Sequence, residues 1–407
     1  MKMENKKINT FDIKRRKLLR NSFLGMCSLP FSSSVFAGLS SSSDDSILGK
    51  KRVIVYELNG GNDGLSTIIP YNDSLYKKFR PTLALGRDEV IPLNSDIALS
   101  NNLSYMSQLF KDNDVAIIQD VGYPNPDLSH FVSRAIWDSG KPAKANSDAT
   151  GWYGDLVVQN RSAFQEANLD VDALCFESHA AFTNGEGVTS LNTKNIAEFL
   201  KSDFVEPNAN TNSSSAQQYL YSLMEKNKQV RLRLLSRLNN KLPKWSGYDT
   251  PLNRNIEMVN WFIKEGVKTP IYKIAQSGFD THSNQKNTHI HLMKTLNQSL
   301  EMLVTSLKKS SEWNNTIILV RSEFGRRVEE NGGRGTDHGT SGPVFLIGGS
   351  VNGGVYGKRA ALDDLDGNGN LKYTTDFRQV YSTIASNFFE LKNNVFLKQG
   401  FETIGFI

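Results

Sequence analysis

Six short apolar runs, each bordered by a polar or glycine-rich loop, are the feature that most constrains how this chain folds. They lie at residues 53–58, 115–118, 173–176, 271–275, 316–320 and 344–347. Stretches with helical periodicity separate them, most clearly at 288–309, where leucines recur every three or four residues. Apolar strands that alternate with helices are typical of a parallel sheet covered on both faces. The sequence therefore predicts an α/β fold with a doubly wound, mostly parallel sheet.

The composition of the remaining segments predicts the domain organisation. Residues 38–51 are rich in Ser and Asp and are expected to be a linker, followed by a single α/β domain at 52–407. Residues 190–265 are rich in Asn, Ser, Lys and Leu and contain helical periodicity. We interpret this stretch as a helical insertion or cap within the domain.

The first 37 residues have the features of an export signal. Arg15 and Arg16 precede a weakly apolar stretch, and Val35-Phe-Ala37 offers small residues at the −3 and −1 positions of a signal peptidase site. Paired arginines before such a stretch are typical of substrates of the twin-arginine translocase. We expect a periplasmic or secreted protein; the alternative is a disordered basic tail.

Removal of this leader changes what the charge and the cysteines imply. The formal net charge of the chain is +5, but the leader holds eight basic and two acidic residues, which leaves 39 basic and 40 acidic ones. Nucleic acid is therefore not an expected partner. Cys175 remains without a second cysteine and lies in an apolar run, which predicts a core residue. No run of about 18 apolar residues exists, so no membrane span is expected.

Polar side chains collect beside the predicted strand ends, where ligands bind in a parallel α/β sheet. The candidates are Asn62, Asp63, Ser129, His130, Asp280, His282, Glu323, Arg326, Asp337 and His338, with His289 at the start of a helix. Carboxylates and imidazoles of this kind suit divalent metals such as Zn, Mn or Mg. The glycine-rich loop at 60–64 also fits a tight turn, and Asp280 also fits a helix cap. Asp337-His338 between glycines favours a site.

Residues 364–370 resemble the start of a calcium-binding loop. The twelfth position of such a loop requires a bidentate Glu, but here it is Thr375. A turn is therefore the favoured interpretation, and Ca²⁺ stays an alternative among the candidate cations. The chain contains no G-x-S-x-G, H-E-x-x-H or G-x-G-x-x-G motif, so the serine-hydrolase, zincin and dinucleotide-binding templates are not matched.

Several longer motifs resemble those of the bacterial family known as domain of unknown function 1501. They are the paired-arginine leader, Leu58-Asn-Gly-Gly-Asn-Asp-Gly-Leu65, Arg80-Pro-Thr-Leu83, Val121-Gly-Tyr-Pro-Asn-Pro126, Ser129-His-Phe131, Gly151-Trp152, Gly278-Phe-Asp-Thr-His282, Ser322-Glu-Phe-Gly-Arg326, Thr336-Asp-His-Gly339 and Thr375-Asp-Phe-Arg378. That family is similar to the alkaline phosphatase and sulfatase superfamily. The resemblance implies a doubly wound sheet with a metal site at its carboxyl edge, and phosphate- or sulfate-ester chemistry through a Ser or Thr nucleophile.

The resemblance assigns site positions one by one. Asp280 and His282 resemble the superfamily's acid and imidazole after a central strand, and His338 resembles its late metal-binding histidine. Glu323 falls where the Asp of an Asp-His pair normally lies. Phe324 occupies the place of the usual metal-binding histidine that follows, which implies a single metal or a site that has lost its metal.

The first strand and the nucleophile position complete this comparison. Asn62 and Asp63 lie near the superfamily's first-strand acid, although Asp63 comes a few residues late. Ser129 lies near the nucleophile, at the start of an expected helix.

Two functions fit these residues. The first is a metal-dependent hydrolase that acts on small-molecule or polysaccharide esters. Its expected groups are a cation on Asp280, His282 and His338, with Glu323, Asp337 and Asp63 as further ligands, Ser129 as nucleophile, His130 or His289 as proton carriers, Arg326 on the anionic ester, and Asn62 and His289 beside the substrate. The second is a non-catalytic binding or assembly protein, acting with a co-exported protein or a surface polysaccharide, which Phe324 motivates.

Overall fold

The computed structural model describes residues 46–141, 150–177, 180–202, 214–242 and 250–407. The expected export signal at 1–37 and the linker up to residue 45 lie outside the described residues, so both stay predictions. The end of the expected linker is helical, because α2 spans Ile47–Lys50.

Within the described residues, nine strands form the main sheet, in the order β13-β5-β12-β9-β1-β8-β6-β7, with β14 beside β5. The strands are β1 (Arg52–Asn59), β5 (Val115–Gly122), β6 (Ala173–Cys175), β7 (Ser190–Asn192), β8 (Ile271–Ser277), β9 (Thr316–Arg321), β12 (Gly342–Ile347), β13 (Gly354–Tyr356) and β14 (Thr375–Asp376). Five of the six apolar runs lie wholly in these strands, and the sixth, 173–176, extends one residue beyond β6. The predicted mostly parallel α/β sheet is therefore confirmed.

Strand β12 runs antiparallel to both of its neighbours, β5 and β9. Its first residue, Gly342, therefore lies at the edge of the sheet where the parallel strands end. This direction brings the segment before β12, which contains Asp337 and His338, to the same edge as the loops that follow β1, β5, β8 and β9. Polar side chains from loops far apart in the sequence therefore meet at the carboxyl edge of the sheet.

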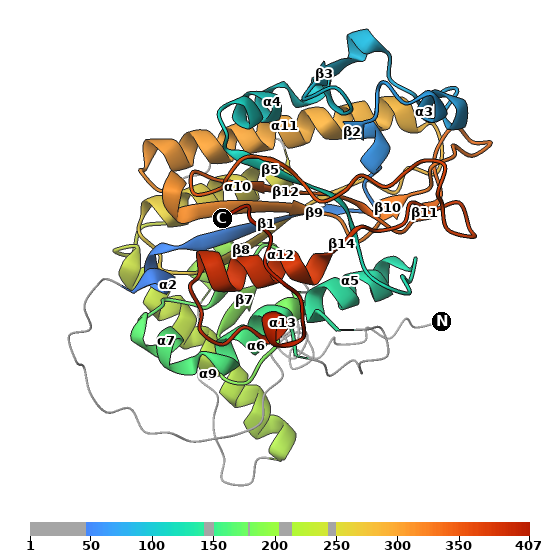
Figure 1. Cartoon of the computed structure of the whole chain (residues 1–407). Coiled ribbons are helices and arrows are strands. Elements are labelled where there is room, and N and C mark those ends of the chain that lie inside the picture. The colour runs from blue at the N-terminus through green and yellow to red at the C-terminus, as the bar shows by residue number, and fades with distance from the viewer. Residues whose placement is uncertain (1–45, 142–149, 178–179, 203–213, 243–249) are drawn as a thin grey trace, which may run out of the picture.

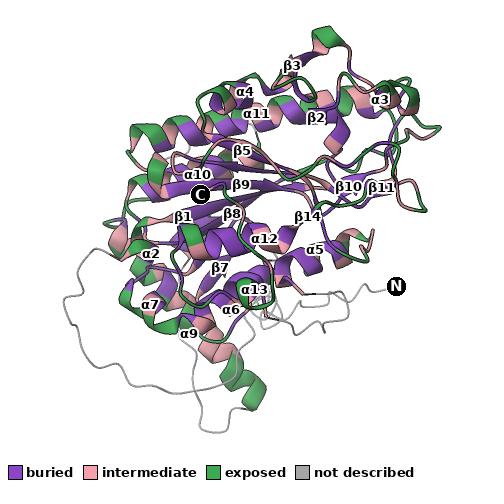
Figure 2. Cartoon of the chain, in the orientation of Figure 1, coloured by how far each residue is buried: buried purple, intermediate pink, exposed green. Residues whose placement is uncertain are grey.

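Helices cover both faces of the sheet (Figure 1). Along β1, Ile54 and Tyr56 point toward the layer of α4 (Ser104–Lys111), α10 (Pro251–Lys264) and α11 (Gln285–Lys309). Val53 and Val55 point toward the opposite layer of α5 (His130–Ser139), α6 (Trp152–Gln159), α12 (Phe377–Thr383) and α13 (Val395–Lys398). The central strands are buried along their length (Figure 2), as their unbroken apolar sequence predicts.

Smaller elements surround these layers. They are α3 (Ser74–Phe79), α7 (Arg161–Glu166), α8 (Ile196–Lys201) and α9 (Ser215–Arg237), a small sheet of β2 (Ile68–Ile69), β3 (Val90–Pro92) and β4 (Ala98–Ser100), and the ribbon of β10 (Gly325–Arg326) and β11 (His338–Gly339). Among the described helices none has both the length and the apolar character that a membrane crossing requires.

The stretch at 190–265, expected as a helical insertion, divides into parts with different positions. Strand β7 forms the outer edge of the main sheet, beside β6. Helix α10 packs against the sheet through Ile256, Val259 and Phe262, each fully buried. The first half of α9, by contrast, buries none of its residues. The polar composition of this stretch thus reflects α9 and the adjoining loops, whereas α10 belongs to the core.

A cluster of ionised side chains is buried between the sheet and α5. Lys273 Nζ lies 2.6 Å from Glu57 Oε2 and 2.7 Å from Glu177 Oε1. Arg321 Nη2 lies 3.0 Å from Asp138 Oδ1, and its Nη1 lies 3.2 Å from Glu57 Oε1. The cluster contains two cations and three carboxylates in a region of low dielectric. Each of these groups stays ionised there only because opposite charges lie next to it. The pKa of Lys273 is accordingly held well above its usual range by the three carboxylates, against the opposing effect of burial.

We predict that Lys273→Met destabilises the protein strongly, because it deprives the buried Glu57 and the partly buried Glu177 of their shared cation. The expected loss in the free energy of unfolding is about 3–5 kcal/mol, measured by urea denaturation at pH 7. Lys294→Met, on the exposed side of α11, is the matched control and should change stability little. A Lys273→Met variant as stable as the control would show that the cluster does not depend on this cation.

Candidate metal centre

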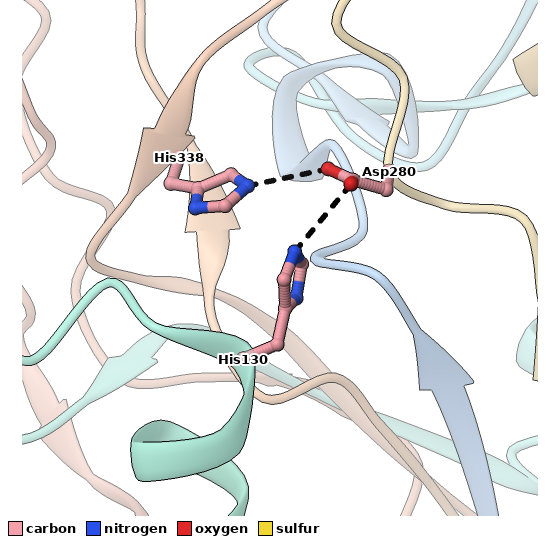
Figure 3. Close-up of side chains that lie close together, drawn as sticks. All are labelled: His130, Asp280 and His338. Atoms are coloured by element: carbon pink, nitrogen blue, oxygen red, sulfur yellow. Dashed lines mark hydrogen bonds and ion pairs between the residues drawn. The ribbon is translucent and has the colours of Figure 1, made fainter.

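The candidate site lies where four loops meet at the carboxyl edge of the sheet. His130 is the first residue of α5, which follows β5, and Asp280 and His282 follow β8. His338 lies in β11, directly opposite Arg326 of β10. Figure 3 shows the imidazoles of His130 and His338 both directed at the carboxylate of Asp280.

Asp280 is the centre of this cluster. Its Oδ1 lies 3.2 Å from His338 Nε2 and 3.0 Å from His282 Nε2, and its Oδ2 lies 3.5 Å from His130 Nε2. The Nε2 atoms of His282 and His338 are themselves 3.0 Å apart. One ligand atom from each of His130, Asp280 and His338 lies within 4.8 Å of the others. Donor atoms in a tetrahedral Zn²⁺ site with bonds of about 2.0–2.1 Å are separated by about 3.3 Å, and the distances from Asp280 to His338 and to His130 are close to this value.

Two histidines of the cluster, His130 and His338, are each held in one orientation and one tautomer. The Nδ1 atom of His338 lies 2.8 Å from the carbonyl oxygen of Leu128. Because a carbonyl only accepts, Nδ1 must carry the proton, and a neutral His338 then presents its Nε2 lone pair to the cluster. The Nδ1 atom of His130 lies 2.9 Å from Glu323 Oε1 in the same arrangement. A metal-binding histidine is usually oriented in this way by a carboxylate or a carbonyl.

His282 is held more loosely. Its Nδ1 lies 3.4 Å from Asp337 Oδ1, and its side chain is 45% exposed, against 24% for His130 and 22% for His338. His282 therefore lies on the solvent side of the cluster, while the other two imidazoles are anchored from inside the protein.

The electrostatics of the cluster favour a charged carboxylate. Partial burial alone would raise the pKa of Asp280, but its contacts with Arg326 and His338 lower it to about 2. Arg326 Nη2 lies 2.7 Å from Asp280 Oδ1. Asp280 is thus an anion at any ordinary pH, as a metal ligand must be.

Glu323 lies beneath the cluster. It is fully buried, and its Oε1 accepts from the backbone N–H of Gly60 and from His130. The Ser322 hydroxyl lies 3.1 Å from Oε2. The sequence suggests Glu323 as a ligand, but these contacts make it the residue that orients His130.

Arg326 connects the loops of the site. Its Nε and Nη groups donate to the backbone carbonyls of Gly60, Gly61, Phe279 and Thr336, in addition to Asp280. The sequence suggests that Arg326 holds an anionic ester, but its donors are engaged within the protein. Its role here is to position Asp280 and the loops around it.

Asp63 and its neighbours form a separate network. Asp63 is 1% exposed, and its Oδ2 accepts from Arg80 Nη1 at 2.5 Å, from Gln285 Nε2 at 2.5 Å and from Ser66 Oγ at 2.6 Å. Burial would raise the pKa of Asp63, but Arg80 lowers it to about 2. The sequence suggests Asp63 as a metal ligand, but in the structure this residue forms a buried ion pair with Arg80. The sequence places Arg80 within a family motif but does not reveal its partner.

Asn62 and His289 form a buried pair instead of contacting the cluster. The Nε2 atom of His289 lies 3.1 Å from Asn62 Oδ1, and Asn62 Nδ2 donates to Thr67. Burial lowers the pKa of His289 to about 4, despite the nearby carboxylate of Asp63. These contacts turn both residues toward the interior, whereas the sequence suggests that they lie beside the substrate.

The backbone of Ser129 is part of the turn that leads into the cluster. Ser129 is exposed, precedes α5, and stands between Leu128, whose carbonyl meets His338, and His130. Its N–H donates to Asp127 Oδ1 at 2.8 Å. The expected nucleophile thus belongs to the same turn as two of the contacts that build the site.

The ring of Phe324 fills the space beneath two imidazoles. Its centroid lies 4.9 Å from that of His130 and 4.7 Å from that of His338, and the residue is 4% exposed. A β-carbon on Gly61 would come within 2.4 Å of this ring. Phe324 and Gly61 thus pack together and leave no room for a further donor at this place.

The low pKa of His289 predicts a pH dependence of stability. The unfolded chain binds a proton at this histidine near pH 6.5, while the folded protein does so only near pH 4, so the free energy of unfolding falls as the pH drops through this window. The expected size is about 3 kcal/mol. His289→Gln should remove this part of the slope in urea denaturation between pH 6.5 and 4. The exposed His291→Gln should keep it, and equal slopes in both variants would contradict a buried neutral His289.

Comparisons with known proteins confirm the family resemblance over part of the chain. Residues 254–386 match the model of a family described as "Protein of unknown function (DUF1501)". No curated protein sequence matches the chain.

Several solved structures are similar in arrangement. Ps i-CgsB in complex with k-i-k-neocarrahexaose is 13% identical over 87% of this chain and 77% of its own, with a TM-score of 0.43. A protein in the alkaline phosphatase superfamily from Vibrio parahaemolyticus is 12% identical over 94% and 76%, with a TM-score of 0.38. The PsFucS1 sulfatase from Pseudoalteromonas sp. is 12% identical over 88% and 71%, also with a TM-score of 0.38.

Proposed function

We propose that this protein is an exported hydrolase of phosphate or sulfate esters that depends on one divalent cation. One observation supports the proposed metal site. The imidazoles of His130 and His338 each donate from Nδ1 to a fixed acceptor and direct Nε2 at the anionic carboxylate of Asp280. Arg326 Nη2, 2.7 Å from Asp280 Oδ1, offsets part of the repulsion among these three converging lone-pair donors. With a divalent cation, they are its ligands.

The donor set narrows the choice of cation. His130, His338 and Asp280 offer two nitrogens and one oxygen, and imidazole suits Zn²⁺ and other transition metals better than Mg²⁺ or Ca²⁺, which prefer oxygen. Three protein ligands with an open side toward solvent are the arrangement of catalytic Zn²⁺ sites. We therefore propose Zn²⁺ as the first cation to test.

The ester chemistry follows from what surrounds this centre. When bound, a divalent cation polarises an ester oxygen and lowers the pKa of a nearby hydroxyl. Ser129, which is exposed and directly precedes His130, would lose its hydroxyl proton and attack the phosphorus or sulfur atom through Oγ. The bond from that atom to the leaving alcohol would break, and water would then hydrolyse the seryl ester. The backbone N–H groups at the start of α5 favour a negatively charged group at the same place. His282, loosely held by Asp337 on the solvent side, would exchange a proton with the substrate.

The metal site is tested by the affinity for Zn²⁺, measured by calorimetry on protein stripped with a chelator. We expect Glu323→Gln to weaken binding about 10–100-fold, because the charge that orients His130 is lost. His338→Ala removes a ligand and should weaken binding further. The exposed Glu329→Gln and His291→Ala are matched controls. Equal affinity in His338→Ala and His291→Ala would reject the site.

The hydrolase is tested by turnover of aryl phosphate and aryl sulfate esters with Zn²⁺, Mn²⁺, Mg²⁺ or Ca²⁺. Ser129→Ala should lower kcat by about 10³-fold or more, and the exposed Ser74→Ala should not. His282→Ala should lower kcat by about 10²–10⁴-fold while it keeps more Zn²⁺ affinity than His338→Ala. A wild-type protein that binds Zn²⁺ but turns over no ester would instead support the non-catalytic binding protein.

A further inference from the structure

An exposed aromatic side chain directly follows a proposed metal ligand in the chain. Phe131 follows His130 directly in α5 and is 81% exposed. The next most exposed large apolar side chain in the described part of the chain, Leu232, is 45% exposed. Apolar surface of this size in contact with water is unfavourable. Because Phe131 is exposed and lies in the first turn of α5, next to His130, its ring is accessible to a ligand that extends beyond the cluster.

Arg134 lies on the same face of α5, one turn further along. Its guanidinium carbon is 5.8 Å from the centroid of the Phe131 ring, and its Nε donates to the carbonyl oxygen of His130 at 3.3 Å. Among the residues that the structure describes, its two Nη groups have no hydrogen-bond partner. A cation held against an aromatic face, with donors to spare, is suited to bind a carboxylate or sulfate.

We propose that Phe131 and Arg134 form a subsite for the part of the substrate beyond the ester that is cleaved. The ligand class is a ring with an apolar face that carries a second negative charge. This inference rests on the proposed function and adds a substrate class to it. The ester group itself would occupy the cluster around Asp280, the ring would stack on Phe131, and the second anion would bind Arg134 Nη.

The unused donors of Arg134 favour a ring with an anionic group over a ring alone. Helix α5 contains one further basic side chain, His130, and its imidazole is directed at Asp280. The donors of Arg326 are engaged within the protein. Arg134, in contrast to both, keeps donors for a ligand beside the exposed ring.

The subsite is tested by the binding of three phosphonates. They take the place of the ester and cannot be hydrolysed. They are methylphosphonate, phenylphosphonate and 4-carboxyphenylphosphonate, titrated by calorimetry into the purified Zn²⁺-loaded protein. Phe131→Ala should weaken the two ring ligands about tenfold and methylphosphonate much less. Arg134→Met should weaken the carboxylated ring about tenfold more than the plain ring. Leu397→Ala and Arg254→Met, both at exposed positions elsewhere, are the controls.

The outcomes separate this inference from the proposed function. If Phe131→Ala weakens all three phosphonates equally, or if no variant weakens any of them, the subsite is overturned even if the wild-type protein hydrolyses esters. The expected pattern of binding in a protein without turnover would support the subsite and reject the hydrolase. Phe131→Leu, which keeps an apolar side chain without a ring, should resemble Phe131→Ala; a wild-type affinity in this variant would show that stacking is not involved.

Discussion

The buried guanidinium of Arg326 is the contact on which the rest of the site depends. It joins the carbonyls of the loop after β1, the loop after β8 and the segment before β11 to the carboxylate of Asp280. These segments are far apart in the sequence. A buried cation is stable only when its donors are satisfied, so the loops must adopt the arrangement that satisfies them. The position of Asp280 is therefore a consequence of the fold.

The same principle explains why the neighbouring acids have different roles. Asp63, in the loop after β1, and Glu323, in the loop after β9, are both buried. Asp63 is neutralised by Arg80, while Glu323 accepts from Gly60 and His130. The contact of Asp63 with Arg80 is a structural ion pair. The contacts of Glu323 fix the orientation of the His130 imidazole relative to the loop after β1. Asp280, half exposed, is the acid that remains open to a cation.

Much of the fold could be predicted from the sequence, because burial of whole strands leaves an unbroken apolar run. The direction of β12 could not, since an antiparallel strand buried on both faces has the same composition as a parallel one. The sequence predicts that Asp280, His282 and His338 meet, and they do, because topology alone brings strand ends together at one edge. It suggests His130 as a proton carrier; the ligand-like orientation could not be foreseen, since it comes from Glu323, which is 193 positions away.

The exposure of the cluster increases in one direction, and this gradient bears on function. Phe324 and Glu323 are buried beneath it, His130 and His338 are about one-quarter exposed, and Asp280 and His282 are about half exposed. The inner groups are held by packing and by fixed acceptors, so they keep their geometry without a ligand. The outer groups face solvent and stay accessible. A site that is rigid on its inner side and open on its outer side has the organisation that exchange of a substrate around a fixed cation requires.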